Sequence, residues 1–203
     1  MPRTPNEKTV SPRAVKPALV LASQSPRRKE LLGILGIPFS VAPASIDEAP
    51  NPGESPESFV VRMAREKCAQ VASRVSKSVV LSADTIVTVD GEILGKPASQ
   101  KDAVHMLQRL SGRRHSVYTA VCVINQVKAA TIEGLDRTEV WFSLMSEGQI
   151  LDYVLREDVM DKAGAYAIQG FAAVYISRIE GNYSNVMGLP LPLVYEFLNR
   201  TLA

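Results

Sequence analysis

Hydrophobic and polar positions change their spacing repeatedly along the chain, and these changes predict an alternation of strands and helices. Short apolar runs without a helical period are typical of buried strands, whereas apolar residues three or four positions apart indicate a helix with one buried face. On this basis we expect strands at 18–23, 78–84, 85–94, 115–125, 137–144 and 172–179. We expect helices at 26–35, 56–75, 100–110, 147–157 and 190–202.

Serine residues mark the predicted starts of four helices. Ser25 and Ser55 are each followed by proline, which fits an N-cap and then the first helical position. Ser99 and Ser146 are each followed, three residues later, by a side chain that can complete a capping box. Gly36 fits the stop of the first helix, because glycine readily adopts the left-handed conformation found there.

The order of the elements favours an α/β fold with a mixed sheet, because strands and helices interleave. The stretch 85–94 indicates a hairpin that turns at Asp90-Gly91. The strands at 115–125 and 137–144 alternate apolar and polar residues, as expected of a sheet covered on one face. A chain of 203 residues can bury a sizeable core, so we predict one domain over residues 18–203.

Residues 1–17 have a different composition from the rest of the chain. Prolines and cations punctuate a polar stretch, which is typical of a flexible, solvated tail. Prolines at this density argue against an amphipathic targeting helix, and no apolar signal segment follows. We therefore expect, by default, a cytoplasmic protein with a flexible N-terminal tail.

Composition limits the classes of partner. The formal net charge of +2 is too small to argue for bulk binding to nucleic acid or to a membrane. No apolar run approaches the roughly 18 residues that a membrane span needs. Cys68 and Cys122 fall in apolar patterns and are predicted to be buried, reduced thiols. Any electrostatic function must therefore come from local clusters of charge.

One such cluster lies where the first strand passes into the first helix. Arg27, Arg28 and Lys29 occupy the first turn of the predicted helix, where cations oppose the helix dipole. Backbone N–H groups at such a turn bind phosphate, and guanidinium groups add bidentate contacts. We therefore expect a polyphosphate site at 23–28, from Ser23 to Arg28. The alternative is that these cations are ordinary solvated surface residues.

Two further stretches carry candidate chemistry. Asp84 ends an apolar run, where a carboxylate facing a cleft could hold a divalent cation or take a proton from water. Lys96 follows the hairpin between Gly95 and Pro97 and would be a positioned cation. Gln169 lies in a glycine-containing loop, and its amide could both donate to and accept from a nucleobase edge. The alternatives are a turn-capping Asp, a surface Lys and a solvated Gln.

Taken together, five long stretches carry a family resemblance from about residue 18 to 201. They are LASQSPRRKELL, REKCAQVA, SADTIVTVDGEILGKP, LSGRRHSVYTAV and DKAGAYAIQGFAAVYISRIEGNYSNVMGLPL. Their order and spacing resemble the Maf family of nucleoside triphosphate pyrophosphatases. That resemblance implies an elongated mixed β-sheet with flanking helices and two lobes around a deep cleft, similar to inosine triphosphate pyrophosphatases.

The resemblance also implies an activity. Maf proteins hydrolyse a nucleoside triphosphate to the monophosphate and pyrophosphate with Mg²⁺ or Mn²⁺. One branch acts on dTTP, UTP and related pyrimidine nucleotides, and another acts on 7-methyl-GTP. The triplet Ala83-Asp84-Thr85 stands where the second branch typically carries Ser-Asp-Gln, which favours the pyrimidine branch. Family members often form dimers, so a homodimer is a further expectation.

Site residues follow from the resemblance position by position. Asp84 matches the proton acceptor, and Arg28, Thr85 and Gln169 match the positions that determine substrate specificity. Further matches to polar or acidic cleft positions are Ser23, Lys67, Lys96 and Glu48, with Asp161 and Lys162 as additional candidates. Glu48 would share the metal with Asp84, while Arg28, Lys67 and Lys96 would hold the triphosphate. Ala167 stands where the family usually has glycine, beside Gln169.

Two other classes of function stay open at this point. A nucleotide-binding regulator of cell division would use the same site without turnover. A nucleic-acid-binding module would use the two arginine pairs at 27–28 and 113–114, but the near-neutral charge and the lack of interleaved aromatic residues count against it. The phosphate-binding string of the commoner P-loop NTPases does not occur in the sequence.

Overall fold

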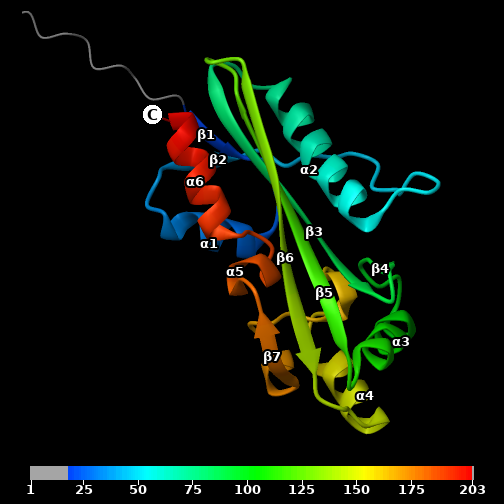
Figure 1. Cartoon of the computed structure of the whole chain (residues 1–203). Helices are drawn as coiled ribbons and strands as arrows, with labels where there is room; N and C mark the ends of the chain where they lie inside the picture. The colour runs from blue at the N-terminus through cyan, green and yellow to red at the C-terminus, as the bar shows by residue number, and fades with distance from the viewer. Residues whose placement is uncertain (1–17, 203) are drawn as a thin grey trace, which may run out of the picture.

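The computed structural model describes residues 18–202, and these form an elongated α/β molecule around one mixed sheet (Figure 1). The seven strands of this part of the chain lie in the order β2-β1-β3-β5-β6-β7, with β4 paired to β3. β1 pairs in parallel with β2 and β3, and the remaining pairs are antiparallel. The strands are β1 (Ala18–Leu21), β2 (Phe39–Val41), β3 (Ser78–Val89), β4 (Glu92–Leu94), β5 (Arg114–Asn125), β6 (Ala130–Phe142) and β7 (Ile176–Glu180).

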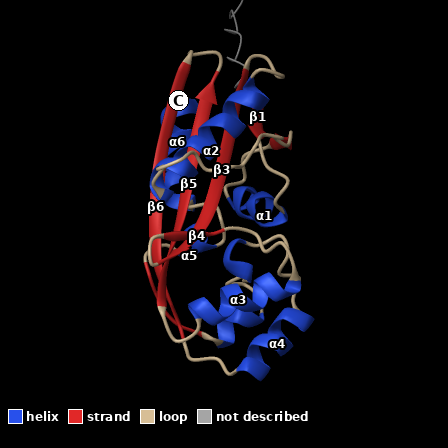
Figure 2. Cartoon of the chain, turned by 90° about the vertical axis from the view of Figure 1, so that its right-hand side faces the viewer, coloured by secondary structure: helices blue, strands red, loops and turns tan. Residues whose placement is uncertain are grey.

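Helices cover the sheet differently at its two ends, which produces the two expected lobes (Figures 1 and 2). In the first lobe, α2 packs on one face of the sheet while α1 and α6 pack on the other. In the second lobe, α3 and α4 share a separate apolar cluster with the far ends of β3, β5 and β6. The helices are α1 (Pro26–Ile34), α2 (Pro56–Ala72), α3 (Gln100–Leu110), α4 (Glu147–Arg156), α5 (Tyr183–Val186) and α6 (Leu191–Leu202), with 3₁₀ turns η1 (Ala163–Ala165) and η2 (Phe171–Val174).

The predicted helix starts are confirmed. Ser25, Ser55, Ser99 and Ser146 each accept a hydrogen bond from the backbone N–H three residues on. Around Ser146 the complete capping box forms. Gly36 has a φ of 65° at the end of α1, as the glycine stop requires. The helix predicted at 56–75 ends earlier, at residue 72, and the last helix begins at residue 191 rather than 190.

Several predicted strand boundaries are wrong because long-range pairing decides them. β3 continues without a break from residue 78 to 89, since β5 pairs with it along almost its whole length. The predicted hairpin with its turn at Asp90-Gly91 is confirmed, because Val87–Val89 pair antiparallel with Glu92–Leu94. The late strand begins at residue 176, because 171–174 form a 3₁₀ turn. The short strand β2 was not predicted from the sequence.

The expected one-sided burial applies to β6 but not to β5. Exposed and covered residues alternate along much of β6, whereas β5 is buried from residue 115 to 123. β5 lies in the middle of the sheet, and helices cover both of its faces in the first lobe, so even Thr119 is fully buried. Strand pattern alone could not reveal this second covering layer.

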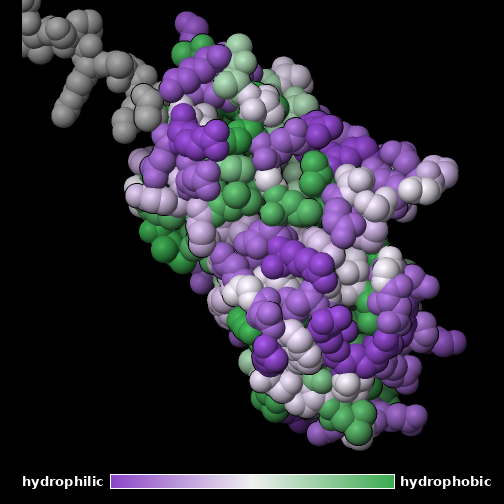
Figure 3. Space-filling view, in the orientation of Figure 1, coloured by the Kyte–Doolittle hydropathy of each residue, from purple (hydrophilic) through white to green (hydrophobic). Residues whose placement is uncertain are grey.

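Hydrophilic side chains dominate the face of the molecule seen in Figure 3, and apolar ones appear singly or in small groups. Within residues 18–202, no helix has the length and apolar character to cross a membrane. Cys68 and Cys122 are both fully buried and free, as expected. The predicted flexible tail lies outside the described residues.

Candidate active site

One edge of β3 has no neighbouring strand in its middle, and this gap positions the candidate site. β1 pairs with β3 only as far as Leu21, opposite Leu81, while β4 pairs with β3 only from Val87 onwards. Asp84 and Thr85 lie in the stretch between. The prediction that Asp84 ends its strand is therefore wrong, because it is the end of β1 that opens the edge beside it.

A cavity of about 770 Å³ lies at this gap, between the two lobes. Its volume is in the usual range for a site that binds a small molecule. Every residue assigned to the site from the sequence lines this one cavity. These residues are Ser23, Arg28, Glu48, Lys67, Asp84, Thr85, Lys96 and Gln169. Residues as far apart in the chain as Ser23 and Gln169 thus meet around a single space.

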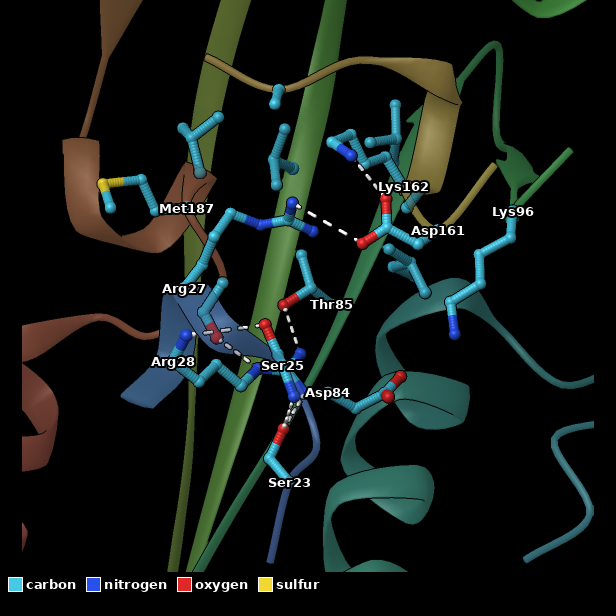
Figure 4. Close-up of a pocket in the computed structure, with 18 of the residues that line it drawn as sticks. Ser23, Ser25, Arg27, Arg28, Asp84, Thr85, Lys96, Asp161, Lys162 and Met187 are labelled. Atoms are coloured by element: carbon cyan, nitrogen blue, oxygen red, sulfur yellow. Dashed lines mark hydrogen bonds and ion pairs between the residues drawn. The ribbon is translucent and has the colours of Figure 1, made fainter. Parts of the chain in front are cut away.

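Arg28 is held in place by four residues, which come from three segments of the chain (Figure 4). Its backbone N–H donates to the N-cap Ser25, which begins α1. Its guanidinium donates to the carbonyl of Gly188 at 2.8 Å, to Thr85 Oγ1 at 3.0 Å and to Ser23 Oγ at 3.4 Å. Burial lowers the pKa of Arg28 from its ordinary value. That ordinary value is so high that the group stays cationic at neutral pH.

Behind Arg28, a chain of hydroxyl groups has a defined direction. Thr119 Oγ1 donates to the carbonyl of Asn185 at 2.9 Å and lies 3.0 Å from Thr85 Oγ1. Because each hydroxyl has one proton, Thr85 must donate to Thr119 while it accepts from Arg28. Gly188 has a φ of 105°, and an added Cβ would stand 3.3 Å from Thr85 Oγ1. Sequence reasoning missed Thr119, Asn185 and Gly188, although a threonine inside an apolar strand was a visible signal.

Lys67 joins the two acidic residues of the site. Its Nζ lies 2.6 Å from Asp84 Oδ1 and 2.8 Å from Glu48 Oε1. Burial acts to raise the pKa of Glu48, but the hydrogen bond and charge of Lys67, helped by Lys96 and Arg28, outweigh it and keep that pKa below its usual value. Asp84 is only 8 % exposed, so the ammonium of Lys67 balances its charge where water cannot.

The remaining charges of the cavity form a looser set across it (Figure 4). Arg27 Nη1 lies 3.8 Å from Asp161 Oδ2, and Lys162 also pairs with Asp161. Lys96 is exposed and makes no ion pair within 4 Å in the described part of the chain. Lys29 does not line the cavity, so only two of the three cations in the first turn of α1 face it.

The loop from residue 161 to 170 is attached to the connection that carries Lys96. The N–H of Gly164 donates to the carbonyl of Gly95 at 3.0 Å. Gly164 has a φ of 66°, and an added Cβ would meet Val87 at 3.0 Å, so close packing against β3 requires glycine there. Gln169, later in this loop, has an exposed side chain on the wall of the cavity.

The second basic stretch, at 111–115, lies outside the site. Arg113 pairs with Asp90 and Arg114 with Glu139, and none of the four lines the cavity. The stretch is not a solvated turn as a whole, because Arg114 and His115 begin β5 and His115 is buried. The cations at 27–28 and at 113–114 therefore do not form one surface around the cavity.

The donor atoms present fit a hard divalent cation in part. Glu48 and Asp84 supply carboxylate oxygens, the ligands that Mg²⁺ and Mn²⁺ prefer, and both already contact one cation, Lys67. No group of three or more His, Cys, Asp or Glu side chains suited to a metal occurs within residues 18–202. Water or phosphate oxygens would therefore have to complete the coordination.

Relatives of this chain share most of its length. A protein from Anaeromyxobacter dehalogenans is 48% identical over 186 residues, covering 91% of this chain and 94% of its own. One from Syntrophomonas wolfei is 46% identical over 180 residues, covering 89% and 95%. Both are named dTTP/UTP pyrophosphatase. Among solved structures, the Staphylococcus aureus Ham1 protein matches with a TM-score of 0.45 and 15% identity over 62% of this chain and 71% of that chain.

The family model described as "Maf-like protein" matches residues 18–201. This range contains every residue that lines the cavity. The chain therefore belongs to the Maf family.

Proposed function

We propose that this protein hydrolyses dTTP, UTP and related or modified pyrimidine nucleoside triphosphates to the monophosphate and pyrophosphate. The names of relatives that are 46–48% identical over about nine tenths of the chain support the substrate class. The observation that carries the proposal is the single cavity, in which cations and carboxylates from distant segments face one small volume.

The cations are suited to hold the triphosphate. A nucleoside triphosphate carries about four negative charges, so positioning and charge stabilisation supply most of the catalysis of phosphoryl transfer. Arg28 is fixed before substrate arrives by its bonds to Gly188 and Thr85. Lys96 has no ion-pair partner to lose within the described residues and can turn to phosphate at little cost. Lys67 is the third triphosphate ligand in this proposal.

Asp84 is the residue that orients or deprotonates the attacking water. Water attacks the α-phosphorus, the α–β bond breaks, and pyrophosphate leaves. The carboxylate lies at the open edge of β3, and its Oδ1 accepts from Lys67. Positioned general bases contribute about 10²–10⁴-fold to such reactions.

Glu48 and Asp84 would hold the divalent cation, Mg²⁺ or Mn²⁺. When bound, the cation neutralises charge that builds up on phosphate oxygens. A carboxylate that binds metal tightly is a weaker base, so the role of Asp84 as metal ligand and as base is the most demanding part of the assignment. Glu48 has a lowered pKa and is therefore ionised, so it can bind the cation together with Asp84.

Thr85 and Gln169, together with Arg28, are suited to select the base. The Gln169 amide offers both a donor and an acceptor, which matches a pyrimidine edge. The Thr85 hydroxyl already makes hydrogen bonds with Arg28 and Thr119, so Thr85 acts as a rigid part of the cavity wall. Ser23 Oγ lies beside the Arg28 guanidinium and completes the phosphate side.

The test is pyrophosphate release from purified protein, measured in a coupled assay over a panel of natural and modified triphosphates. We expect turnover of dTTP and UTP with Mg²⁺ or Mn²⁺, loss of turnover with a chelator, and recovery when the cation is returned. Binding of dTTP and UTP without release would favour a nucleotide-sensing regulator instead. Faster release from 7-methyl-GTP would place the chain with the other substrate branch.

A further inference from the structure

Lys67 lies between the two carboxylates that are proposed to hold the divalent cation. Its Nζ contacts Asp84 Oδ1 at 2.6 Å and Glu48 Oε1 at 2.8 Å, and its side chain is 12 % exposed. A second cation placed between the same oxygens would lie against the ammonium group. Like charges at such a separation in a partly buried site repel strongly. Lys67 and a metal held between these two oxygens would therefore compete for them.

The two carboxylates alone also make a poor metal site. Mg²⁺ requires six oxygen ligands in octahedral geometry, and usually takes one or two carboxylates together with substrate phosphates. The described residues offer no third His, Cys, Asp or Glu near this pair. Phosphate oxygens would supply the missing ligands, and they would also give the ammonium of Lys67 a new anionic partner.

From this geometry, and resting on the proposed function, we propose that Lys67 holds the place of the divalent cation in the nucleotide-free protein. The metal then enters only together with a nucleoside triphosphate, whose phosphates draw Lys67 away from Glu48 and Asp84. Lysine suits this exchange because its charge sits on a long, flexible stem. Cation uptake and nucleotide uptake are thus coupled through one side chain.

Lys96 provides a comparison that separates the charge of the cavity from the bridging contacts of Lys67. It lines the same cavity and carries the same charge, but it makes no ion pair with either carboxylate. Removing Lys96 would change the overall charge of the cavity as much as removing Lys67 would. Among the described residues only Lys67 bridges the two carboxylates, so its removal, and not that of Lys96, should free them for a metal.

The experiment measures Mn²⁺ bound to the protein in the absence of nucleotide, by electron paramagnetic resonance of the free ion. Lys67→Met should bind Mn²⁺ about tenfold more tightly than the unchanged protein, a normal size for a coupling between two ligands. Lys96→Met should change that affinity by less than about threefold. Equal Mn²⁺ affinity of Lys67→Met and the unchanged protein would overturn the proposal.

A second measurement uses only the unchanged protein, so its result does not depend on whether a variant folds. Mn²⁺ retained by the protein is compared at equal free Mn²⁺, with and without α,β-imido-UTP, which cannot be cleaved at the α–β bond, or tripolyphosphate. Retention should rise by about tenfold with either probe. Equal retention of Mn²⁺ with and without these probes would contradict the proposed exchange of Lys67 for the metal.

If circular dichroism shows that Lys67→Met is unfolded, Lys67→Gln takes its place in the first measurement.

This outcome is separable from the proposed function. Both measurements are made at equilibrium without turnover, and tripolyphosphate carries no base. Failure to release pyrophosphate from dTTP and UTP would remove the proposed activity and leave the metal equilibria to be judged separately. Turnover of dTTP together with tight Mn²⁺ binding by the nucleotide-free protein would remove only the place-holding role of Lys67.

Discussion

Asp84 and Thr85 are neighbours in sequence, but they serve opposite faces of β3. Successive side chains of a strand point to opposite sides, so Asp84 meets Lys67 of α2 while Thr85 meets Arg28 of α1. The open edge of β3 lets both sides face one cavity. A step of one residue thus separates the proposed catalytic carboxylate from the proposed specificity hydroxyl.

Replacement of the carboxylate tests the first of these roles. Asp84→Asn should lower kcat for dTTP by about 100-fold or more, because an amide cannot accept the proton of the attacking water. Lys67 keeps Glu48 as a partner, so the fold should persist by circular dichroism. Asp152→Asn, which makes the same change on the exposed side of α4, is the control. Near-normal turnover by Asp84→Asn would refute its role.

Changes at the specificity positions should alter the choice of base rather than phosphate binding. Thr85→Ala removes the acceptor that holds Arg28 at 3.0 Å, and Gln169→Ala removes an amide from the cavity wall. Each should change the ratio of kcat/KM between pyrimidine and competing nucleotides by about tenfold. For Gln169 the reason is a lost hydrogen bond to the base, which is worth roughly that much, and for Thr85 it is the loss of the contact that fixes Arg28. Inhibition by pyrophosphate should change less. An unaltered ranking of bases would show that these positions do not select the nucleotide.

At the scale of elements, the starts of α1 and α4 are capped in the same way, but only the start of α1 also belongs to the candidate site. Both helices follow a capping serine whose Oγ accepts a hydrogen bond from the backbone N–H of the third helical residue. The distance is 3.4 Å to Arg28 N in α1 and 3.3 Å to Gln149 N in α4. Ser25 also lines the cavity, and the N–H that it caps belongs to Arg28 itself. The two caps therefore form a matched pair for separating stability from function.

Deletion of each cap should cost a similar amount of stability but affect activity differently. Ser25→Ala and Ser146→Ala should each lower the free energy of unfolding by about 1 kcal/mol, measured by urea denaturation. Only Ser25→Ala should raise KM for dTTP, by several-fold, because Arg28 loses part of its anchor. A rise in KM with Ser146→Ala of equal size would mean that general destabilisation, and not the position of Arg28, causes the effect.

At the scale of the whole molecule, the second lobe contains a buried histidine that links stability to pH. His115 is 2 % exposed, its Nε2 lies 2.8 Å from the Tyr166 hydroxyl, and its Nδ1 has no partner among the described residues. Burial lowers the pKa of His115 to about 4, against an ordinary value of 6.5. The unfolded chain therefore binds a proton between these two pH values that the folded protein does not.

Acid should destabilise the fold through this residue. Because the folded pKa is depressed, stability is complete above pH 6.5 and falls as the pH drops towards 4, by about 3 kcal/mol in all. His115→Gln should lose this part of the pH dependence in urea denaturation between pH 4.5 and 7. His105→Gln, the same change at an exposed position of α3, should keep it. Identical slopes for the unchanged protein and His115→Gln would contradict the assignment.

Much of the site could be found from the sequence because its motifs are local. All eight assigned residues line one cavity, although their chemical roles stay predictions. The second hydrogen-bonded layer could not be found in this way. Thr119 and Gly188 act through contacts with residues far away in the chain, and the Arg28 to Gly188 bond spans 160 positions. Such a long-range contact cannot be predicted from a short stretch of sequence.

By itself, the sequence determined the starts of the four serine-capped helices, the turn at Asp90-Gly91 and the family of the chain. Caps and turns depend on hydrogen bonds between residues a few positions apart, so a short stretch contains all the information that they need. Only the tertiary structure decided that β3 runs on through Asp84, that β5 is buried on both faces, and that Lys67 lies between Glu48 and Asp84. These features depend on which distant segments pack together, and burial and pairing across the sheet outweigh the local signals.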